Sequence, residues 1–184
     1  MTFDIPLPWT AAEYLKLGET AGRVELLAGS LWFGPRPGDI HQDITCNLLG
    51  TLRAPARAAG FRALRGAKLR LGPECVALPD LVAGRCDRRA ESVAPDEVIL
   101  VGEVASPETA MVDRCLKRDL YADAGIAWYL LIEPSLPDHT AITVRLLRLA
   151  GDHYVKDKVA ELGEVLKTDG PFPFQLHAED LLDF

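Results

Sequence analysis

The 184-residue sequence has few cysteines and no long apolar run, and each absence excludes a class of protein. Cys46, Cys75, Cys86 and Cys115 form no CxxC pair and show no zinc-type spacing to histidine. We therefore predict free, buried thiols in place of a zinc site or a disulfide framework. The apolar runs are far too short to span a bilayer, and the opening MTFDIPLPWT lacks the pattern of a signal peptide. We expect a cytoplasmic protein without a membrane segment.

An excess of positive charge is also missing, since 20 Lys and Arg face 27 Asp and Glu for a formal net charge of −7. This balance argues against a surface coated for nucleic acid, although a local basic groove can coexist with an acidic total. The one basic cluster lies in FRALRGAKLRLG, which we interpret as a bent strand or a hairpin. Its solvent-facing side chains would be Arg62, Arg65, Lys68 and Arg70. The length fits one domain over residues 1–184, without internal repeats.

The N-terminal part predicts two helices around a hairpin. Thr10 and Glu13 have the spacing of a capping box, which indicates a short helix over residues 10–17. RVELLAGSLWFG predicts two strands that turn at residues 28–30. Asp39 is placed to cap a long helix with an apolar stripe, and Pro55 is expected to kink or end it.

The remaining chain is rich in predicted strands. CVALPDLVAG indicates one strand made irregular by the proline before Asp80, and the run from Val98 indicates a strand buried on both faces. Further strands are expected over residues 127–132, 141–149 and 153–156, with LPDHT as a turn and AEDLLDF as a short closing helix. The predicted class is therefore mixed α/β.

The stretch from Val98 to Pro134 carries the least expected residue, an acid at the exit of a buried strand. Glu103 in that position must be paired, protonated or bound to a metal. Thr109 can then cap a helix in which Asp113, Lys117 and Tyr121 follow at intervals of four and share one face. A lysine would thus be carried back over the acid.

Glu25, Asp80 and Glu103 are three acids set among apolar residues on three predicted strands. If they converge, they would repel one another unless a hard divalent cation such as Mg²⁺ neutralised them. Lys117 could then orient or activate a water, or stabilise charge on a phosphoryl group. Spacing alone does not bring Glu25 and Asp80 together.

An ordered set of motifs resembles a known family. Pro79-Asp80, the segment EVASPET from Glu103, and DxxxKxxxYxxxGI from Asp113 resemble the Uma-two family of restriction endonucleases, a branch of the PD-(D/E)XK nuclease superfamily. RVELLAGSL and the helix that contains His41 are similar to the opening of that family, so the likeness covers most of the chain. The PD dipeptide is weak alone, whereas the ordered set is fairly specific.

The resemblance implies a restriction endonuclease-like fold, with a central mixed sheet flanked by helices, an extra N-terminal hairpin and extra C-terminal strands. It implies Asp80 and Glu103 as ligands of Mg²⁺ or Mn²⁺, Glu25 as an accessory acid and metal ligand, and Lys117 as the catalytic lysine. The superfamily lysine usually follows the second acid by two residues, where this chain has Ala105. The Uma-two family is similar in placing its lysine on the next helix, which favours Lys117 over Lys68.

A second departure from the family follows Gly125, where an acid-Tyr-Trp triplet is usual and this chain reads Trp128-Tyr129-Leu130. The implied function is a metal-dependent endonuclease that hydrolyses phosphodiester bonds in DNA. A homodimer is expected by analogy, because cutting both strands generally needs two sites. The alternatives are a catalytically silent module that binds nucleic acid or protein, and a metal site for another hydrolysis.

Each candidate residue also has a structural explanation. Glu103 could bond backbone amides at a strand end, Asp80 could mark a turn, and Glu25 could be a solvated strand residue. Lys117 could form a surface ion pair with Asp113. For His41 we favour capping or packing over a direct role. Tyr121 is expected at the edge of the core, with its hydroxyl bonded.

Overall fold

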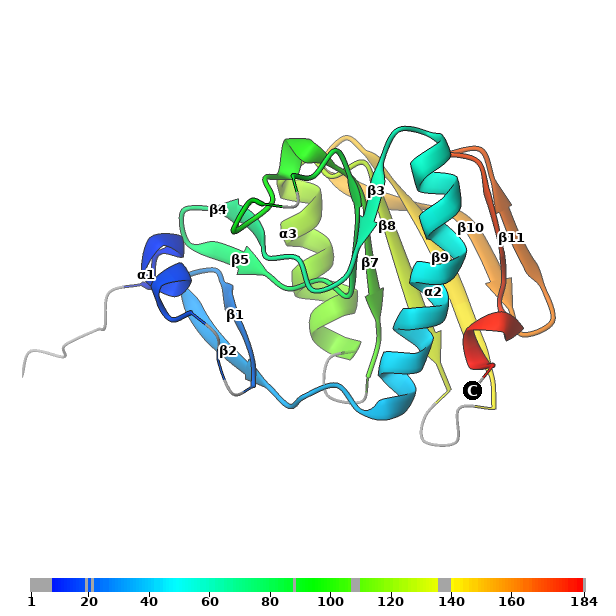
Figure 1. Cartoon of the computed structure of the whole chain (residues 1–184), viewed down its shortest axis with the longest axis horizontal. Helices are drawn as coiled ribbons and strands as arrows, with labels where there is room; N and C mark the ends of the chain where they lie inside the picture. Colours follow the sequence, from blue (N-terminus) through cyan, green and yellow to red (C-terminus); the bar gives the residue numbers. More distant parts are fainter. Residues whose placement is uncertain are drawn as a thin grey trace, which may run out of the picture.

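The computed structural model describes residues 8–18, 20, 22–87, 89–106, 110–135 and 140–183. Within these ranges the chain forms a six-stranded sheet, a four-stranded sheet and a two-stranded sheet, with helices beside them (Figure 1). The predicted class, mixed α/β with a central mixed sheet flanked by helices, is confirmed. In the described part of the chain, no helix combines the length and the apolar character needed to cross a membrane.

The six-stranded sheet has the order β10-β9-β8-β7-β6-β3. Its strands are β3 (Arg62–Leu64), β6 (Leu81–Gly84), β7 (Val98–Val104), β8 (Trp128–Pro134), β9 (Ile142–Ala150) and β10 (His153–Glu161). β7 and β8 are parallel, and the other neighbours are antiparallel. Parallel neighbours need a crossover connection. The crossover here contains η2 (Val112–Lys117) and α3 (Arg118–Asp123).

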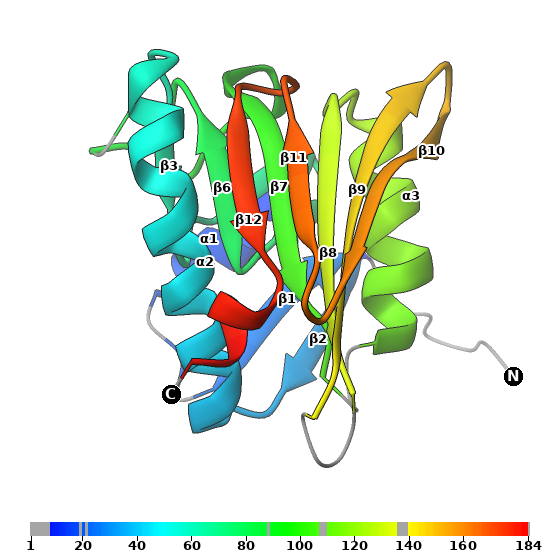
Figure 2. The same cartoon turned by 90° about the vertical axis from the view of Figure 1, so that its right-hand side faces the viewer.

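Different elements cover the two faces of this sheet. The long helix α2 (Asp39–Ala58) lies on one face with the C-terminal β11 (Val165–Thr168), β12 (Phe174–His177) and η3 (Glu179–Leu182), while α3 lies on the other (Figure 2). Along β7, Leu100 packs in the cluster with α2 and Val101 packs in the cluster with α3. β7 is therefore buried on both faces, as its apolar run predicts.

The four-stranded sheet has the order β2-β1-β5-β4 and lies to the left in Figure 1. Its strands are β1 (Arg23–Leu27), β2 (Ser30–Gly34), β4 (Leu69–Gly72) and β5 (Cys75–Ala77). The predicted β1–β2 hairpin is confirmed, and Gly29 at φ +76° supplies the left-handed backbone of its turn. The capping box of Thr10 and Glu13 is also present, at the start of α1 (Ala11–Lys16).

Two segments predicted as single units divide between the two sheets. FRALRGAKLRLG is neither a bent strand nor a hairpin, because β3 joins the large sheet and β4 joins the small one. CVALPDLVAG likewise splits into β5 and β6. Residues 78–80 separate them, and Pro79 has no N–H to donate to a ladder. Asp80 consequently lies in a link between sheets and not within a strand.

Smaller predictions also need correction. The N-cap of α2 is Gly38 and not Asp39. Pro55 does not end the helix, which continues to Ala58. Because Pro55 lies in the last turn, its missing N–H removes little of the helix's hydrogen bonding. The thiols are free, but only Cys75 and Cys86 are buried. The short helix η1 (Pro95–Glu97) precedes β7. Thr109 and residues 136–139 of the predicted turn lie outside the described residues.

Candidate active site

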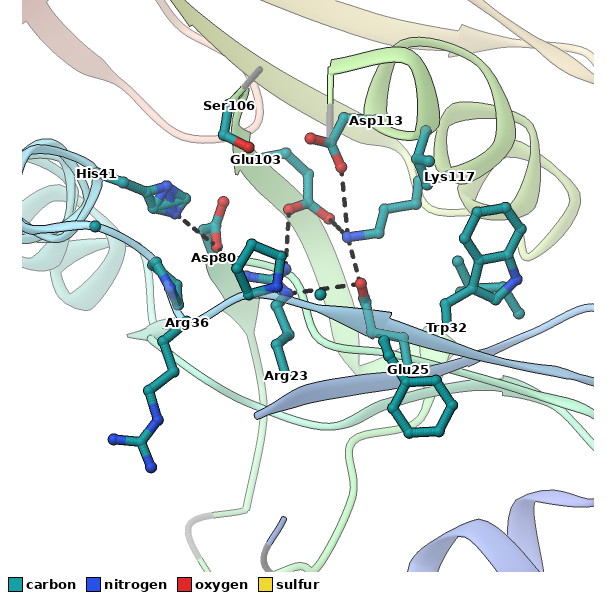
Figure 3. A pocket seen from close by; sticks show the side chains of 17 residues that line it. Arg23, Glu25, Trp32, Arg36, His41, Asp80, Glu103, Ser106, Asp113 and Lys117 are labelled. Carbon is teal, nitrogen blue, oxygen red and sulfur yellow. Dashed lines mark hydrogen bonds and ion pairs between the residues drawn. The ribbon is translucent and has the colours of Figure 1, made fainter. Parts of the chain in front are cut away.

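Three carboxylates meet where the small sheet approaches the exit of β7 (Figure 3). Glu25 comes from β1, Asp80 from the link before β6, and Glu103 from the end of β7. The backbone holds two of them in place, since Leu78 N–H donates to Glu25 Oε1 at 2.7 Å and Val104 N–H donates to Asp80 Oδ2 at 2.8 Å. The link between the sheets thus brings together acids that are far apart in the sequence.

Glu103 is the most deeply buried of the three, with 1% of its surface exposed. Its Oε1 accepts a hydrogen bond from Tyr121 Oη at 2.6 Å and one from Lys117 Nζ at 3.1 Å. Its Oε2 has no hydrogen-bond partner among the described residues. Burial raises the pKa of Glu103 to about 8, although Lys117 acts in the opposite direction. One oxygen of a buried acid is therefore left for a further ligand.

Lys117 lies at the centre of the acids, with its ammonium group 3.0 Å from Glu25 Oε1, 3.1 Å from Glu103 Oε1 and 3.4 Å from Asp113 Oδ1. Burial favours the neutral amine, but these carboxylates outweigh it and raise the pKa of Lys117. The lysine is thus a permanent cation near neutral pH. A surface ion pair with Asp113 is excluded, because both residues are 1% exposed.

The helix turn that carries Asp113 and Lys117 is a π-helix, η2, which continues directly into α3. π-Helical turns are rare in proteins, but those that occur often lie at functional sites. Tyr129 on β8 donates a hydrogen bond to the backbone oxygen of Asp113 at 3.0 Å and so ties this turn to the sheet. The central tyrosine of the unusual Trp128-Tyr129-Leu130 triplet therefore supports the site.

Arg23 is the residue that sequence reasoning missed. Its Nη1 lies 2.8 Å from Asp80 Oδ1, its Nε lies 3.6 Å from Glu25 Oε2, and its Nη2 lies 3.7 Å from Glu103 Oε2. The side chain is 16% exposed. A signal was available, because Arg23 and Glu25 are two residues apart on β1 and residues at that spacing line one face of a strand.

His41 and Tyr121 also lie closer to the acids than their sequence interpretation predicts. His41, from the first turns of α2, places Nε2 3.2 Å from Asp80 Oδ1, and burial lowers its pKa and favours the neutral ring. Tyr121 is fully buried and does not lie at the core edge. Its hydroxyl has a hydrogen-bond partner, as predicted, and that partner is Glu103. Glu25 is 7% exposed, so the interpretation as a solvated strand residue is wrong.

The acids line an open cavity of about 310 Å³. β2 and the segment that follows also line it, including Trp32 and residues 34–37. Trp32 pairs with Glu25 across the β1–β2 hairpin, and the Arg36 guanidinium points away from the acids (Figure 3). The cavity thus has apolar side chains next to the charged groups.

The charges of the buried cluster do not balance. Glu25, Asp80, Glu103 and Asp113 supply four carboxyl groups, whereas Arg23 and Lys117 supply two permanent cations. Burial and the neighbouring acids raise the pKa of Glu103, so a proton on Glu103 offsets part of this surplus. Carboxylate oxygens suit a hard divalent cation, and the unbonded Glu103 Oε2 offers one. In the described residues, no three His, Cys, Asp or Glu side chains already form a coordination shell. A divalent ion held by these side chains where they now lie would therefore have fewer than three of them as ligands.

Comparisons with known proteins agree with this fold. A family model described as "Putative restriction endonuclease", Uma2, matches residues 11–180. A solved structure, a putative nuclease belonging to DUF820 from Anabaena variabilis, matches with a TM-score of 0.71 at 20% identity. The match covers 95% of this chain and 98% of that one, and at this identity it establishes the fold alone. No curated protein matched the sequence.

Proposed function

Because the chain belongs to the Uma2 family of restriction endonuclease-like proteins, we propose that it hydrolyses phosphodiester bonds in DNA with a divalent cation, Mg²⁺ or Mn²⁺. Membership of this family supports a nuclease function, and the Anabaena variabilis protein of the same fold is itself described as a "putative nuclease". The observation that supports the metal-dependent part is the excess of four carboxyl groups over two permanent cations in the buried cluster, beside an unbonded oxygen of Glu103. A divalent cation bound there would reduce the repulsion among these carboxylates.

Asp80 and Glu103 would hold the cation, with Glu25 as the accessory acid. Glu25 Oε1 already accepts from Leu78 N–H and faces Lys117, so its share in binding would come from Oε2. Mg²⁺ commonly keeps several waters and binds through one or two carboxylates and phosphate oxygens. When bound, the cation would supply Lewis-acid stabilisation of the phosphodiester and lower the pKa of a water.

Lys117 acts in this proposal as a fixed positive charge. Its raised pKa keeps the ammonium protonated, so it cannot accept a proton from water near neutral pH. It can donate hydrogen bonds to an attacking water or to the phosphoryl oxygens, where negative charge increases in the transition state. Asp113 and Glu25 hold the ammonium in place, and Tyr121 orients the Glu103 carboxylate.

The alternative is a module that keeps the fold and binds nucleic acid or protein without cutting it. Arg23 favours this alternative in one respect, because its guanidinium already neutralises part of the acidic cluster without a metal ion. The two functions differ in a measurable way, since only the nuclease requires divalent cations for turnover. The predicted homodimer and cytoplasmic location stay predictions.

The test is cleavage of supercoiled plasmid DNA by the full chain with Mg²⁺ or Mn²⁺, and with EDTA as the metal-free control. We expect Asp80→Asn and Lys117→Met to lose roughly 10²-fold or more in rate, because each removes a group that acts on the transition state. Glu133→Gln is the matched control, since Glu133 lies on the neighbouring strand β8 and bonds Arg114 and Arg145 outside the cluster. Absence of both cleavage and calorimetric cation binding in the wild type would overturn the proposal.

A further inference from the structure

The guanidinium of Arg23 lies among the three carboxylates proposed to serve the metal. It forms one close contact, Nη1 to Asp80 Oδ1 at 2.8 Å, and two longer ion pairs, to Glu25 at 3.6 Å and to Glu103 at 3.7 Å (Figure 3). Its Nη2 also donates a hydrogen bond to Leu78 O. One planar cation therefore faces all three acids from the side of the small sheet.

The placement of Arg23 comes from the fold and not from a loop. Arg23 and Glu25 share one face of β1, whose strand pairs with both β2 and β5. The link at residues 78–80 leaves β5 and supplies both Leu78 O and the Asp80 carboxylate to the same guanidinium. The arginine thus fastens the link to the small sheet and holds Asp80 near Glu103.

The Arg23 guanidinium and the Glu103 carboxyl nevertheless leave hydrogen-bonding atoms unpaired. Arg23 Nε and Glu103 Oε2 are buried polar atoms without a hydrogen-bond partner among the described residues. The 3.7 Å separation between Nη2 and Glu103 Oε2 is too long for a hydrogen bond. A small divalent ion binds carboxylate oxygen at about 2.0–2.1 Å for Mg²⁺ and carries twice the charge. Such an ion would satisfy these acids better than the guanidinium does.

We propose that Arg23 is the resident cation of the acidic cluster, and that a divalent metal ion binds by displacing its guanidinium from Asp80 and Glu103. The inference rests on the metal site of the proposed function. In the metal-free protein, Arg23 holds the carboxylates together against their mutual repulsion. On metal entry, its bond to Leu78 O keeps the released side chain at the rim of the cavity. Arg23 thereby lowers the metal affinity of the site.

The experiment is calorimetric titration of Mn²⁺ into the full-length wild type, Arg23→Met, Arg23→Lys and Arg65→Met. We expect Arg23→Met to bind Mn²⁺ at least about tenfold more tightly than the wild type, because the competing charge is gone. Arg23→Lys should fall between them, since an ammonium cannot contact the acids as a fork. Arg65→Met is the matched control, because it removes one exposed positive charge from the neighbouring hollow without touching the acids. Its affinity should stay near that of the wild type.

A second measurement covers the case in which Arg23→Met does not fold. In wild-type protein labelled with ¹⁵N, the side-chain Nε–H signal of Arg23 should shift on addition of Mg²⁺, while that of Arg65 should not. Arg23→Lys provides the assignment, because its spectrum lacks the Arg23 signal. A shift at Arg23 supports the inference, and an unchanged signal at saturating Mg²⁺ overturns it.

The outcomes separate this inference from the proposed function. Binding of Mn²⁺ to the wild type with no gain in Arg23→Met overturns the displacement and leaves the proposed metal site standing. Tighter binding in Arg23→Met than in the wild type supports the displacement, whereas binding by that variant alone overturns it, because the wild-type guanidinium is then not displaced. Failure of the wild type and of every folded variant to bind Mn²⁺ overturns both together.

Discussion

Glu103 and Glu133 lie near the ends of neighbouring parallel strands, β7 and β8, and each contacts two cationic side chains, yet their surroundings differ. Glu133 bonds Arg114 and Arg145, whose side chains are 54% and 43% exposed. Burial acts against its charge, but the two arginines prevail and lower the pKa of Glu133. Glu103 is buried beside other acids, and its pKa is raised. The same residue type thus forms an ordinary ion pair on one strand, whereas on the next strand it is a buried acid with a raised pKa.

This contrast shows which acids are arranged for more than stability. The half-buried carboxylate of Glu133 has both of its oxygens paired with partly exposed arginine side chains. The cluster around Glu103 instead has more carboxyl groups than cations in a place where charge is costly to hold, and the pKa of Glu103 is raised there. Perturbed carboxylates in a cavity are characteristic of functional sites, although structural networks can also perturb them.

The largest difference between the Glu103 cluster and the Glu133 ion pairs is expected when a cation is removed from each. Lys117→Met should lower the free energy of unfolding by about 3–5 kcal/mol, because buried carboxylates lose their partner. Arg114→Met should cost less than about 1 kcal/mol, since its ion pair is exposed and Glu133 keeps Arg145. Urea unfolding at neutral pH measures both. Equal losses of stability in the two variants would mean that the Glu103 cluster depends no more on Lys117 than Glu133 depends on Arg114.

The pH dependence of stability should have opposite sign at the two acids. The pKa of Glu103 is raised from 4.5 to about 8, so the folded state binds a proton that the unfolded state releases across this window. Wild-type stability should therefore fall relative to Glu103→Gln as the pH rises from about 5 to about 8. The pKa of Glu133 is lowered in the folded state. Its contribution to the stability of the fold is therefore present above the ordinary pKa of a glutamate and is lost as the pH falls through the pKa in the folded state.

Unfolding of the wild type, Glu103→Gln and Glu133→Gln at several pH values measures these slopes. Relative to Glu133→Gln, the wild type should be more stable near neutral pH, and the difference should disappear in acid. Parallel curves for the wild type and Glu103→Gln would show that the Glu103 carboxyl keeps an ordinary pKa, and the contrast between the two acids would then fail.

A smaller effect than that of Lys117→Met is expected at two buried tyrosines. Tyr121 Oη donates to Glu103 Oε1 and Tyr154 Oη donates to Ile126 O, each at 2.6 Å. Tyr121→Phe and Tyr154→Phe should each lower stability by about 1–2 kcal/mol, because each leaves a buried acceptor with one bond fewer. Only Tyr121→Phe should also change Mn²⁺ affinity, which calorimetry measures. A change of the same size in Tyr154→Phe would indicate a general loss of packing.

Sequence reasoning was most successful where a single local pattern decides the structure. The capping box at Thr10, the β1–β2 hairpin and the doubly buried β7 are confirmed, since a short stretch determines each of them. The prediction was wrong where one apolar segment divides between two sheets, as in CVALPDLVAG. Alternation gives the direction in which side chains point, but it does not say which neighbouring strand the backbone will pair with.

The candidate site divides in the same way. Glu103, Asp113 and Lys117 lie within fifteen residues of one another, and strand and helix periodicity predicted that the lysine would return over the acid. Asp80 and Glu25 were chosen by residue type and by family resemblance, and their role stays a prediction. Arg23 was missed, because a charged residue at the start of a strand is usually exposed to solvent, and its two-residue spacing from Glu25 shows a shared strand face without showing that the face is buried.

The sequence by itself determined the class of fold, the acids and the lysine, because strand and helix periods and the motif spacing are properties of neighbouring residues. The tertiary structure alone decided that residues 78–80 cross between two sheets and deliver Asp80 to Glu103, and that Arg23 faces all three acids. It also decided how deeply the cluster is buried. The charge of a carboxylate is local, whereas its pKa and its capacity for a cation depend on every group that the fold places around it.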